Sequence, residues 1–260
     1  MGHGAPGSVR LKLLWNPNLA CERLGYWAHQ RRRLKRLRGT VAHSLTLGHI
    51  ESLELVESVS HLGIGTVYDI GANAGTWVLL AKAVLPTARV EAFEPLASHF
   101  PAFLKNVGND STVSLHKLAL GSQNTTAVLH VTSFSDASSL LALEQRGVAE
   151  FGVTETGQVP VEVRRLDDYR AEHRLPFPDL IKLDVQGYEV DVLMGASECL
   201  EHARAIVAEV SFEQYYTNQC LLHDIVGCLA KHQFYVAAVG DRTQTGTLLT
   251  QTDVLFLRRS

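Results

Sequence analysis

The sequence has few cysteines, and none of them is arranged as a metal site or a disulfide framework requires. Its 260 residues include four cysteines, without a CxxC pair and without a spacing shared with histidine ligands. The twelve histidines form no HxxxH or HxH group. Reduced thiols and the absence of a metal cofactor are therefore the predictions for this chain.

Long apolar runs and a strong net charge are also absent. Neither a secretory signal nor an uncharged apolar stretch of membrane-spanning length is visible, so we expect a cytoplasmic protein without a transmembrane segment. The formal net charge of -3 gives no overall field that would attract nucleic acid, so we expect no nucleic-acid partner.

The first 65 residues are predicted to form a helical extension. Residues 1–10 are glycine-rich and expected to be disordered, and residues 49–62 carry the apolar stripe of a helix. Between them lies a basic cluster: Arg31, Arg32, Arg33, Lys35, Arg36 and Arg38. The cluster is interpreted as the solvated face of a helix, with a contact to an anionic substrate or a weak membrane-surface contact as the alternative. These N-terminal helices cap the active site or form a homodimer contact, and the sequence leaves both open.

Residues 66–260 alternate strand and helix patterns, which predicts one α/β domain with a doubly wound, mostly parallel sheet. The predicted strands are Thr66–Ile70, Arg89–Phe93, Val113–Ala119, Thr125–Val131, Val159–Val163, Leu180–Val185 and Ala205–Val210. The predicted helices are Thr76–Val84, Leu96–Val107, Tyr188–Leu200 and His223–Lys231. Strands Phe234–Val239 and Val254–Leu257, joined by a loop over Gly240–Thr252, are expected to form an antiparallel edge hairpin.

A glycine-containing loop between the first strand and the first helix of this domain predicts a cofactor site. Gly71 permits a sharp turn, Gly75 permits close packing, and Thr76 opens the helix whose first amides can receive a carboxylate. Asp69, at the end of the strand, is placed to accept hydrogen bonds from an ammonium group. Asn73 stands where a GxGxxG dinucleotide loop has its second glycine, which disfavours a pyrophosphate-containing cofactor such as NAD.

A second acidic residue strengthens this prediction. Glu94 ends the second strand, directly before Pro95, which holds the turn; a carboxylate there can bind a ribose diol. Glu91 is expected to be a surface charge. Together the two features favour S-adenosylmethionine over NAD, and an NAD-type oxidoreductase or a non-catalytic cofactor-fold protein are the less favoured alternatives.

Several blocks in their order and spacing resemble the FkbM family of methyltransferases. They are YDIGANAG (68–75), AFEP (92–95), LKN (104–106), ALG (119–121), SSL (138–140), RLDDY (165–169) and DLIKLDVQGYEVDVLMGA (179–196). The resemblance implies a Rossmann-like class I methyltransferase fold, a cofactor contact at Ala119, and methyl transfer to a hydroxyl of a sugar, glycolipid or natural product. C- or N-methylation on the same fold is the alternative. The family block commonly has Glu where this chain has Gln186, which weakens the idea of a three-carboxylate metal site.

The last of these blocks supplies candidate catalytic residues. Lys182 and Asp184 share one face of an apolar strand, where a charged pair is costly unless it serves a partner. Asp184 is predicted to contact the cofactor or the substrate hydroxyl, and Lys182 to neutralise Asp184 or orient the substrate. A structural Lys–Asp pair is the alternative for both. Glu189 opens the next helix and is expected to cap it.

Deprotonation of a hydroxyl requires a general base. Glu209, at the end of its strand, is the further catalytic candidate, and His116 and His130 are considered with it. The polar interval after the fifth strand is expected to be a lid or a mobile surface loop. The predicted substrate contacts are Ser138, Ser139, Glu213 and Tyr215.

Overall fold

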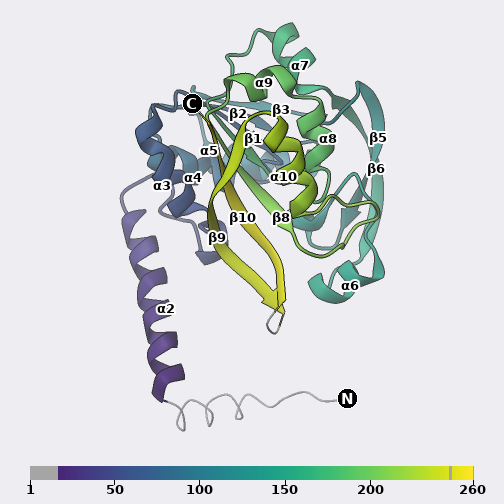
Figure 1. Ribbon diagram of the computed structural model, residues 1–260. Coiled ribbons are helices and arrows are strands. Elements are labelled where there is room, and N and C mark those ends of the chain that lie inside the picture. Colours follow the sequence, from purple (N-terminus) through teal and green to yellow (C-terminus); the bar gives the residue numbers. More distant parts are fainter. Residues whose placement is uncertain (1–16, 246–247, 260) are drawn as a thin grey trace.

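The structure is a computed structural model that describes residues 17–245 and 248–259. A seven-stranded sheet with the order β3-β2-β1-β7-β8-β10-β9 lies at its centre (Figure 1). Strands β3, β2, β1, β7 and β8 are parallel, and β10 runs antiparallel to both β8 and β9. The strands are β1 (Thr66–Ile70), β2 (Arg89–Phe93), β3 (Val113–His116), β7 (Leu180–Leu183), β8 (Ala205–Ser211), β9 (Phe234–Thr245) and β10 (Leu248–Arg258). This arrangement confirms the predicted fold class, including the antiparallel edge.

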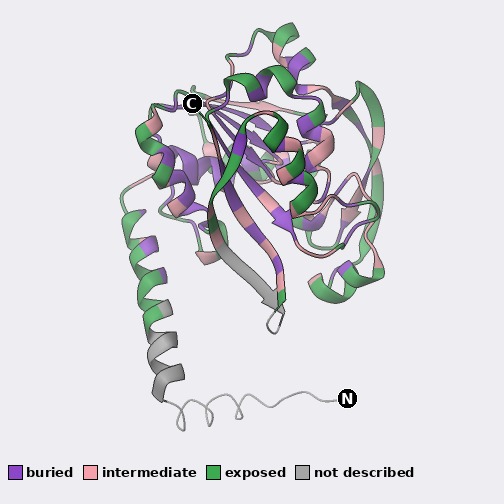
Figure 2. Ribbon diagram, viewed as in Figure 1, coloured by how far each residue is buried: buried purple, intermediate pink, exposed green. Residues whose placement is uncertain are grey.

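Helices cover both faces of the sheet because successive strand residues point to opposite sides. Val67 packs into a core with α3 (Leu53–Val59), α4 (Thr76–Val84) and α5 (Phe100–Val107). Its neighbour Tyr68 packs into a second core with α7 (Leu166–His173), α8 (Glu189–Met194), α9 (Ser197–His202) and α10 (Leu222–Lys231). Figure 2 shows the central strands buried between the two layers. The sheet is therefore doubly wound, and in such folds ligands bind at the carboxyl edge of the strands.

The terminal hairpin is longer than predicted. The segment 240–252, expected to be a loop, is mostly strand, because β9 and β10 continue to pair through three register shifts. Such irregularities bend and twist a hairpin without ending it. The loop prediction is wrong because it rests on glycine and threonine, and threonine also suits a twisted strand.

Four other elements differ from the prediction. The strand expected over 113–119 divides into β3 and β4 (Ala119–Leu120), and β4 joins β5 (Thr125–Thr132) and β6 (Glu155–Arg164) in a separate three-stranded sheet. The helix expected over 188–200 breaks at Gly195, where an added Cβ would lie 2.1 Å from the Gly121 carbonyl oxygen. Helices α6 (Gln145–Phe151) and α7 were not predicted.

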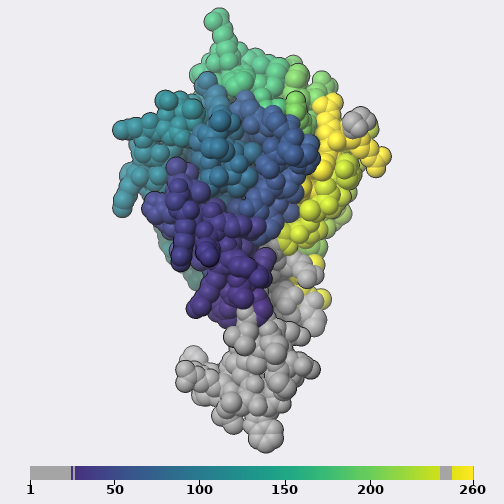
Figure 3. Space-filling view, turned by 90° about the vertical axis from the view of Figure 1, so that its left-hand side faces the viewer, coloured from purple at the N-terminus to yellow at the C-terminus, as the bar shows by residue number. Residues whose placement is uncertain are grey.

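The N-terminal part contains α2 (Pro17–Arg36), followed by η1 (Leu47–His49), α3 and η2 (Ser60–Leu62). The basic cluster on α2 divides into two kinds of residue. Arg33 is buried and hydrogen-bonds the Ile50 and Glu51 carbonyl oxygens, whereas Arg31, Arg32, Lys35 and Arg38 are exposed. In Figure 3 this N-terminal segment, in purple, lies against the following blue part of the chain. The predicted disorder of residues 1–10 lies outside the described residues. Among those that are described, no helix has both the length and the apolar character required to cross a membrane.

Candidate active site

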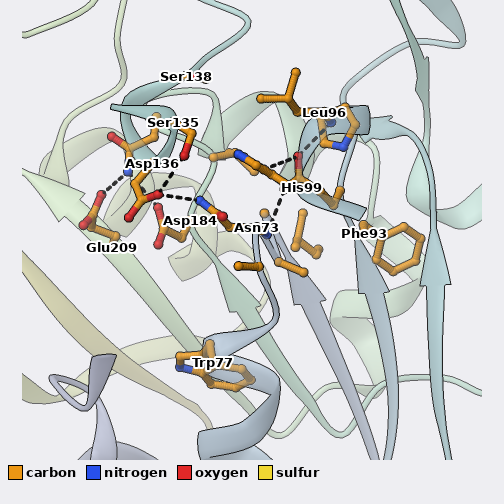
Figure 4. Close-up of a pocket in the computed structure, with 18 of the residues that line it drawn as sticks. Asn73, Trp77, Phe93, Leu96, His99, Ser135, Asp136, Ser138, Asp184 and Glu209 are labelled. Carbon is orange, nitrogen blue, oxygen red and sulfur yellow. Dashed lines mark hydrogen bonds and ion pairs between the residues drawn. The ribbon is translucent and has the colours of Figure 1, made fainter. Parts of the chain in front are cut away.

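A pocket of about 710 Å³ opens at the carboxyl ends of β1, β2 and β7, where ligands bind in doubly wound folds. Its walls come from the loop after β1, the turn after β2, the 184–186 turn after β7, and strands β8 and β10. Residues Gly48, His49, Glu51 and Ser52 of the N-terminal segment also line it. In Figure 4, Asn73 lies between Asp184 and Glu209 on one side and His99 and Leu96 on the other.

The loop after β1 has the backbone conformation that its sequence requires. Gly71 has a φ of 85°, and an added Cβ would lie 1.8 Å from the Asp184 carbonyl oxygen. Asn73 has a φ of 47°, a left-handed conformation that asparagine tolerates better than most residues. Asn73 therefore supplies part of the conformational freedom that a second glycine would give. Gly71 brings the main chains of the loops after β1 and β7 into contact.

The start of α4 agrees partly with the prediction. Thr76 lines the pocket at the N-terminus of this nine-residue helix. Gly75 is not among the lining residues. Its added Cβ would lie 2.9 Å from the Phe103 ring, so Gly75 allows α4 and α5 to pack closely.

Glu94 is held firmly at the end of β2 and is 5% exposed. Its carboxylate accepts hydrogen bonds from the backbone N–H groups of Asn73 (2.8 Å) and Leu96 (2.7 Å). Glu94 and Pro95 both line the pocket. The carboxylate thus joins the loops after β1 and β2, in addition to any bond that it forms with a ligand.

His99 was not predicted from the sequence. It is 8% exposed, lines the pocket, and its Nδ1 lies 3.2 Å from Glu94 Oε1. Its Nε2 has no hydrogen-bond partner among the described residues. A buried polar atom without a partner is costly, which indicates that a ligand completes this part of the pocket.

Asp69 is fully buried, and neither carboxylate oxygen has a hydrogen-bond partner in the described part of the chain. It directly precedes the lining residues Ile70 and Gly71 but does not line the pocket itself. Burial raises the pKa of Asp69 to about 7, and nearby Lys182 opposes that rise. A positive charge brought to this end of the pocket would stabilise the Asp69 carboxylate.

Charged residues on adjacent strands extend from Asp69 along one face of the sheet. Asp69 is paired in register with Lys182, and Glu209 is paired with Asp253 of β10. The alternation of side chains places all four on the face that packs against α3 and α4. Lys182, Glu209 and Asp253 line the pocket, and Asp253 was not predicted. The pocket therefore has an acidic side.

Lys182 forms the ion pair predicted from the sequence. Its Nζ lies 2.8 Å from Asp184 Oδ2. Burial alone would lower the pKa of Lys182, but the carboxylates of Asp184 and Asp69 raise it above its ordinary value. Lys182 is therefore a fixed cation at neutral pH, and both residues of the pair line the pocket.

Gln186 connects the two catalytic candidates that carry carboxylates. Its Nε2 donates hydrogen bonds of 2.8 Å to Asp184 Oδ1 and 2.8 Å to Glu209 Oε2. Its Oε1 accepts a hydrogen bond of 3.1 Å from the Tyr216 hydroxyl. The departure from the family block thus places an amide, instead of a third carboxylate, between Asp184 and Glu209.

The electrostatic surroundings make Glu209 a stronger base than an ordinary glutamate. Burial raises its pKa well above the usual value, and the negative charges of Asp184 and Asp253 add to the rise. Lys182 counteracts them. A carboxylate with a raised pKa is better matched to proton transfer near neutral pH.

The other candidates divide between the pocket and its surroundings. Ser138, Ser139 and Ala119 line the pocket. Ser139 Oγ donates a hydrogen bond to the Gln186 carbonyl oxygen (2.8 Å). The polar interval after β5 forms η4 (Ser135–Ala137), whose Asp136 accepts a hydrogen bond from Asn73 Nδ2 (2.9 Å).

Four candidates lie elsewhere. Glu213 forms an ion pair with Arg146, and Tyr215 is buried against Phe151; neither lines this pocket. The two candidate bases His116 and His130 are also outside it, bonded to Glu91 and Glu155 respectively. Sequence proximity to Glu209 did not identify which residues after β8 face the pocket.

Two acidic residues outside the pocket have structural roles. Glu91 is not a surface charge: it is completely buried, and hydrogen bonds from His116 and Arg89 lower its pKa against the effect of burial. Glu189 accepts hydrogen bonds from the backbone N–H groups of Val185 and Gly187, so it holds the turn after β7. No group of three or more His, Cys, Asp or Glu side chains suited to a metal ion occurs within residues 17–245 and 248–259.

The pocket fits S-adenosylmethionine in three respects. Buried Asp69 and the acidic lining suit a ligand that carries an ammonium and a sulfonium. Glu94 and His99 offer polar atoms for a nucleoside. The N-terminus of α4 suits the carboxylate of an amino-acid tail. The fold and the site together define an S-adenosylmethionine-dependent methyltransferase.

Comparison with known proteins agrees with this assignment. A family model described as the methyltransferase FkbM domain matches residues 69–236. The chain therefore belongs to the FkbM methyltransferase family, and its cofactor is S-adenosylmethionine.

The curated relatives include methyltransferases that act on different acceptors. The chain is 31% identical over 170 residues to 2-O-methyltransferase NoeI of Sinorhizobium fredii, a match that covers 63% of this chain and 70% of NoeI. It is 31% identical to Methyltransferase 1 of Beauveria bassiana, covering 51% and 58% of the two chains. It is 27% identical to 31-O-demethyl-FK506 methyltransferase FkbM of Streptomyces tacrolimicus, covering 71% and 78%.

Proposed function

We propose that this methyltransferase transfers the methyl group to a hydroxyl oxygen of a neutral sugar, glycolipid or natural product. The observation that carries the proposal is Glu209: a carboxylate of raised pKa that lines the pocket and is held next to Asp184. A hydroxyl is a weak nucleophile at neutral pH and requires a base. The names of the relatives NoeI and FkbM, which specify O-methylation, also support this acceptor atom.

The chain's own residues orient the acceptor and remove its proton. Bound S-adenosylmethionine supplies a methyl group on a sulfonium, which is already an activated leaving group. Glu209 accepts the hydroxyl proton, and Lys182 forms an ion pair with Asp184 beside it. Ser138 and Ser139, which also line the pocket, contact the substrate in this proposal. Alignment of the oxygen with the methyl group then accounts for most of the catalysis.

The charge of the pocket narrows the substrate class. The lining contains one lysine, already paired, and six carboxylates: Glu51, Glu94, Asp136, Asp184, Glu209 and Asp253. An anionic acceptor would be repelled by these carboxylates, because their number exceeds that of the single lysine. We therefore favour an uncharged hydroxylated acceptor over a uronic acid or a phosphorylated sugar.

Screening with mass detection tests this proposal. Neutral glycosides, the matching uronic acids and the matching amino sugars are incubated with enzyme and S-adenosylmethionine, and products are analysed for one added methyl group and its position. O-methylated neutral products are expected, and their formation should fall about 100- to 10,000-fold in Glu209→Gln because the general base is lost. Exclusive N- or C-methylation, or a preference for the uronic acids, would contradict it.

The N-terminal residues 1–65 are proposed to be an extension that completes the catalytic domain, residues 66–260. Support comes from His49 and Glu51, which line the pocket, and from the Trp77 Nε1 hydrogen bond to Ser52 Oγ (2.8 Å). This bond attaches the extension to α4 beside the cofactor loop.

We also propose a weak contact of α2 with an anionic membrane surface on the cytoplasmic side. Trp27 is 55% exposed, and Arg31 and Lys35 follow it at helical spacing.

Co-sedimentation with phosphatidylserine-containing vesicles should decrease about fivefold for Lys35→Gln, at about 1 kcal/mol per basic residue. Equal binding to pure phosphatidylcholine vesicles would contradict the contact. The alternative role of α2 is a homodimer contact, and analytical ultracentrifugation would measure the oligomeric state.

A further inference from the structure

Gln186 has three features that the cofactor and the acceptor do not explain. Its φ of 56° is left-handed, an unusual conformation for a long side chain. It follows Asp184 closely in the chain, yet its amide reaches Glu209 on the next strand. It also bonds the Tyr216 hydroxyl. An uncommon backbone conformation that aims a side chain between two carboxylates is a reason to look for a functional role.

The chemistry of the amide fixes its orientation. The NH2 group has two hydrogens, one for Asp184 Oδ1 and one for Glu209 Oε2, each at 2.8 Å. The reversed amide would place its oxygen against both carboxylates. The Tyr216 hydroxyl, which donates to the amide oxygen, favours the same orientation.

The contacts leave one oxygen of Glu209 available. Oε2 accepts hydrogen bonds from Gln186 (2.8 Å) and from Gln251 Nε2 (3.3 Å). Oε1 has no hydrogen bond from any residue that the structure describes, and Glu209 lines the pocket. The fixed oxygen therefore faces the amide, and the other oxygen remains for a substrate proton.

We propose that Gln186 is a positioning residue that holds Asp184 and Glu209 together as two carboxylates and keeps Glu209 Oε1 available to the acceptor hydroxyl. This role rests on the proposed function of Glu209. Two neighbouring carboxylates otherwise share a proton or take up a cation, and either event would neutralise the base. The neutral amide donates a hydrogen bond to one oxygen of each carboxylate. The pair therefore needs neither a shared proton nor a bound cation.

The groups facing Glu209 set the direction of the expected change. The negative charges are Asp184, Asp253 and Glu189, and the positive charge is Lys182. Loss of the amide removes a donor that favours ionised Glu209, while all four charges remain. The protonated form of Glu209 then becomes more favourable, so its titration moves to higher pH.

Carbon-13 NMR titration of the glutamate and aspartate carboxyl groups tests the proposal without an acceptor. The Glu209 signal is assigned by its loss in Glu209→Gln. Gln186→Asn keeps an amide and suits a left-handed backbone, but it is one methylene too short to bridge. The apparent pKa of Glu209 should rise by about one to two pH units, the effect of losing one hydrogen bond to a charged group.

Gln251→Asn is the matched control, since Gln251 contacts the same Glu209 oxygen at 3.3 Å and, within the described residues, forms no hydrogen bond with Asp184. This control should raise the apparent pKa of Glu209 by less than half as much as Gln186→Asn does. Gln186→Glu should raise the apparent pKa of Glu209 further. This variant should also bind Mn²⁺ in calorimetry, whereas the wild type should give no heat of binding. Unchanged titration in both Gln186 variants, or an equal shift in the control, would overturn the proposal. Failure to find an O-methylated product would instead contradict the proposed function alone.

Discussion

The two sides of the pocket are constructed differently. The cofactor side comes from a short part of the chain, residues 69–99, and backbone groups hold it: Gly71 and Ala72 donate to the Phe93 carbonyl, and Asn73 donates to Glu94. The side proposed for the acceptor is lined by side chains from distant segments, including Asp184, Glu209 and Asp253. The first side is specified by local sequence, whereas the second depends on how the strands are ordered in the sheet.

Gly71 is the point where the two sides meet, so its substitution should have the largest effect. In Gly71→Ala the added Cβ would lie 1.8 Å from the Asp184 carbonyl oxygen, at a φ that disfavours alanine. We expect the free energy of unfolding to fall by at least about 3 kcal/mol. Urea unfolding measures this loss. Gly227→Ala, at a helical position with no atom within 4 Å, should be neutral or slightly stabilising. Similar stability of the two variants would mean that the sides do not touch as described.

Glu94→Gln should weaken the cofactor side selectively. The variant loses charge and one acceptor at a carboxylate that also fixes Asn73 and Leu96. Affinity for S-adenosylhomocysteine should fall about 10- to 100-fold, since a hydrogen bond to a charged group contributes about 1.5–3 kcal/mol. Some stability should be lost with it, contrary to the expectation for a carboxylate at the surface. Unchanged affinity would remove Glu94 from the cofactor site.

Asp69→Asn should give a change in stability that depends on pH. Burial raises the pKa of Asp69 from 3.8 to about 7, so its ionisation destabilises the folded wild type as pH rises through this interval. The asparagine variant has no such ionisation. Relative to the wild type it should gain stability from pH 4 to pH 8 in denaturant unfolding. A stability difference independent of pH would show that Asp69 does not titrate there.

The sequence predicted the cofactor side better than the acceptor side for a physical reason. Strand, turn and helix signals around Asp69–Thr76 and Glu94 are local, and they placed β1, α4 and β2 correctly. Lys182, Asp184 and Glu209 were found because charges interrupt apolar strands near their ends.

Residues that act across the sheet gave weaker signals. Asp253 lies opposite Glu209 only because β10 pairs antiparallel with β8, and its segment was predicted to begin a strand one residue later. His49 reaches the pocket through packing of the extension. Glu213 and Tyr215 were chosen for their closeness to Glu209 in the chain, which does not determine the direction of a side chain in a loop.

Calorimetry with S-adenosylhomocysteine and NAD, applied to the wild type and to Glu209→Gln, tests the central claim most directly. We predict that both proteins bind S-adenosylhomocysteine with similar affinity, because the cofactor side is independent of Glu209. We also predict that neither protein binds NAD, because the loop after β1 lacks the second glycine of a dinucleotide loop. Binding of NAD without S-adenosylhomocysteine would contradict the account.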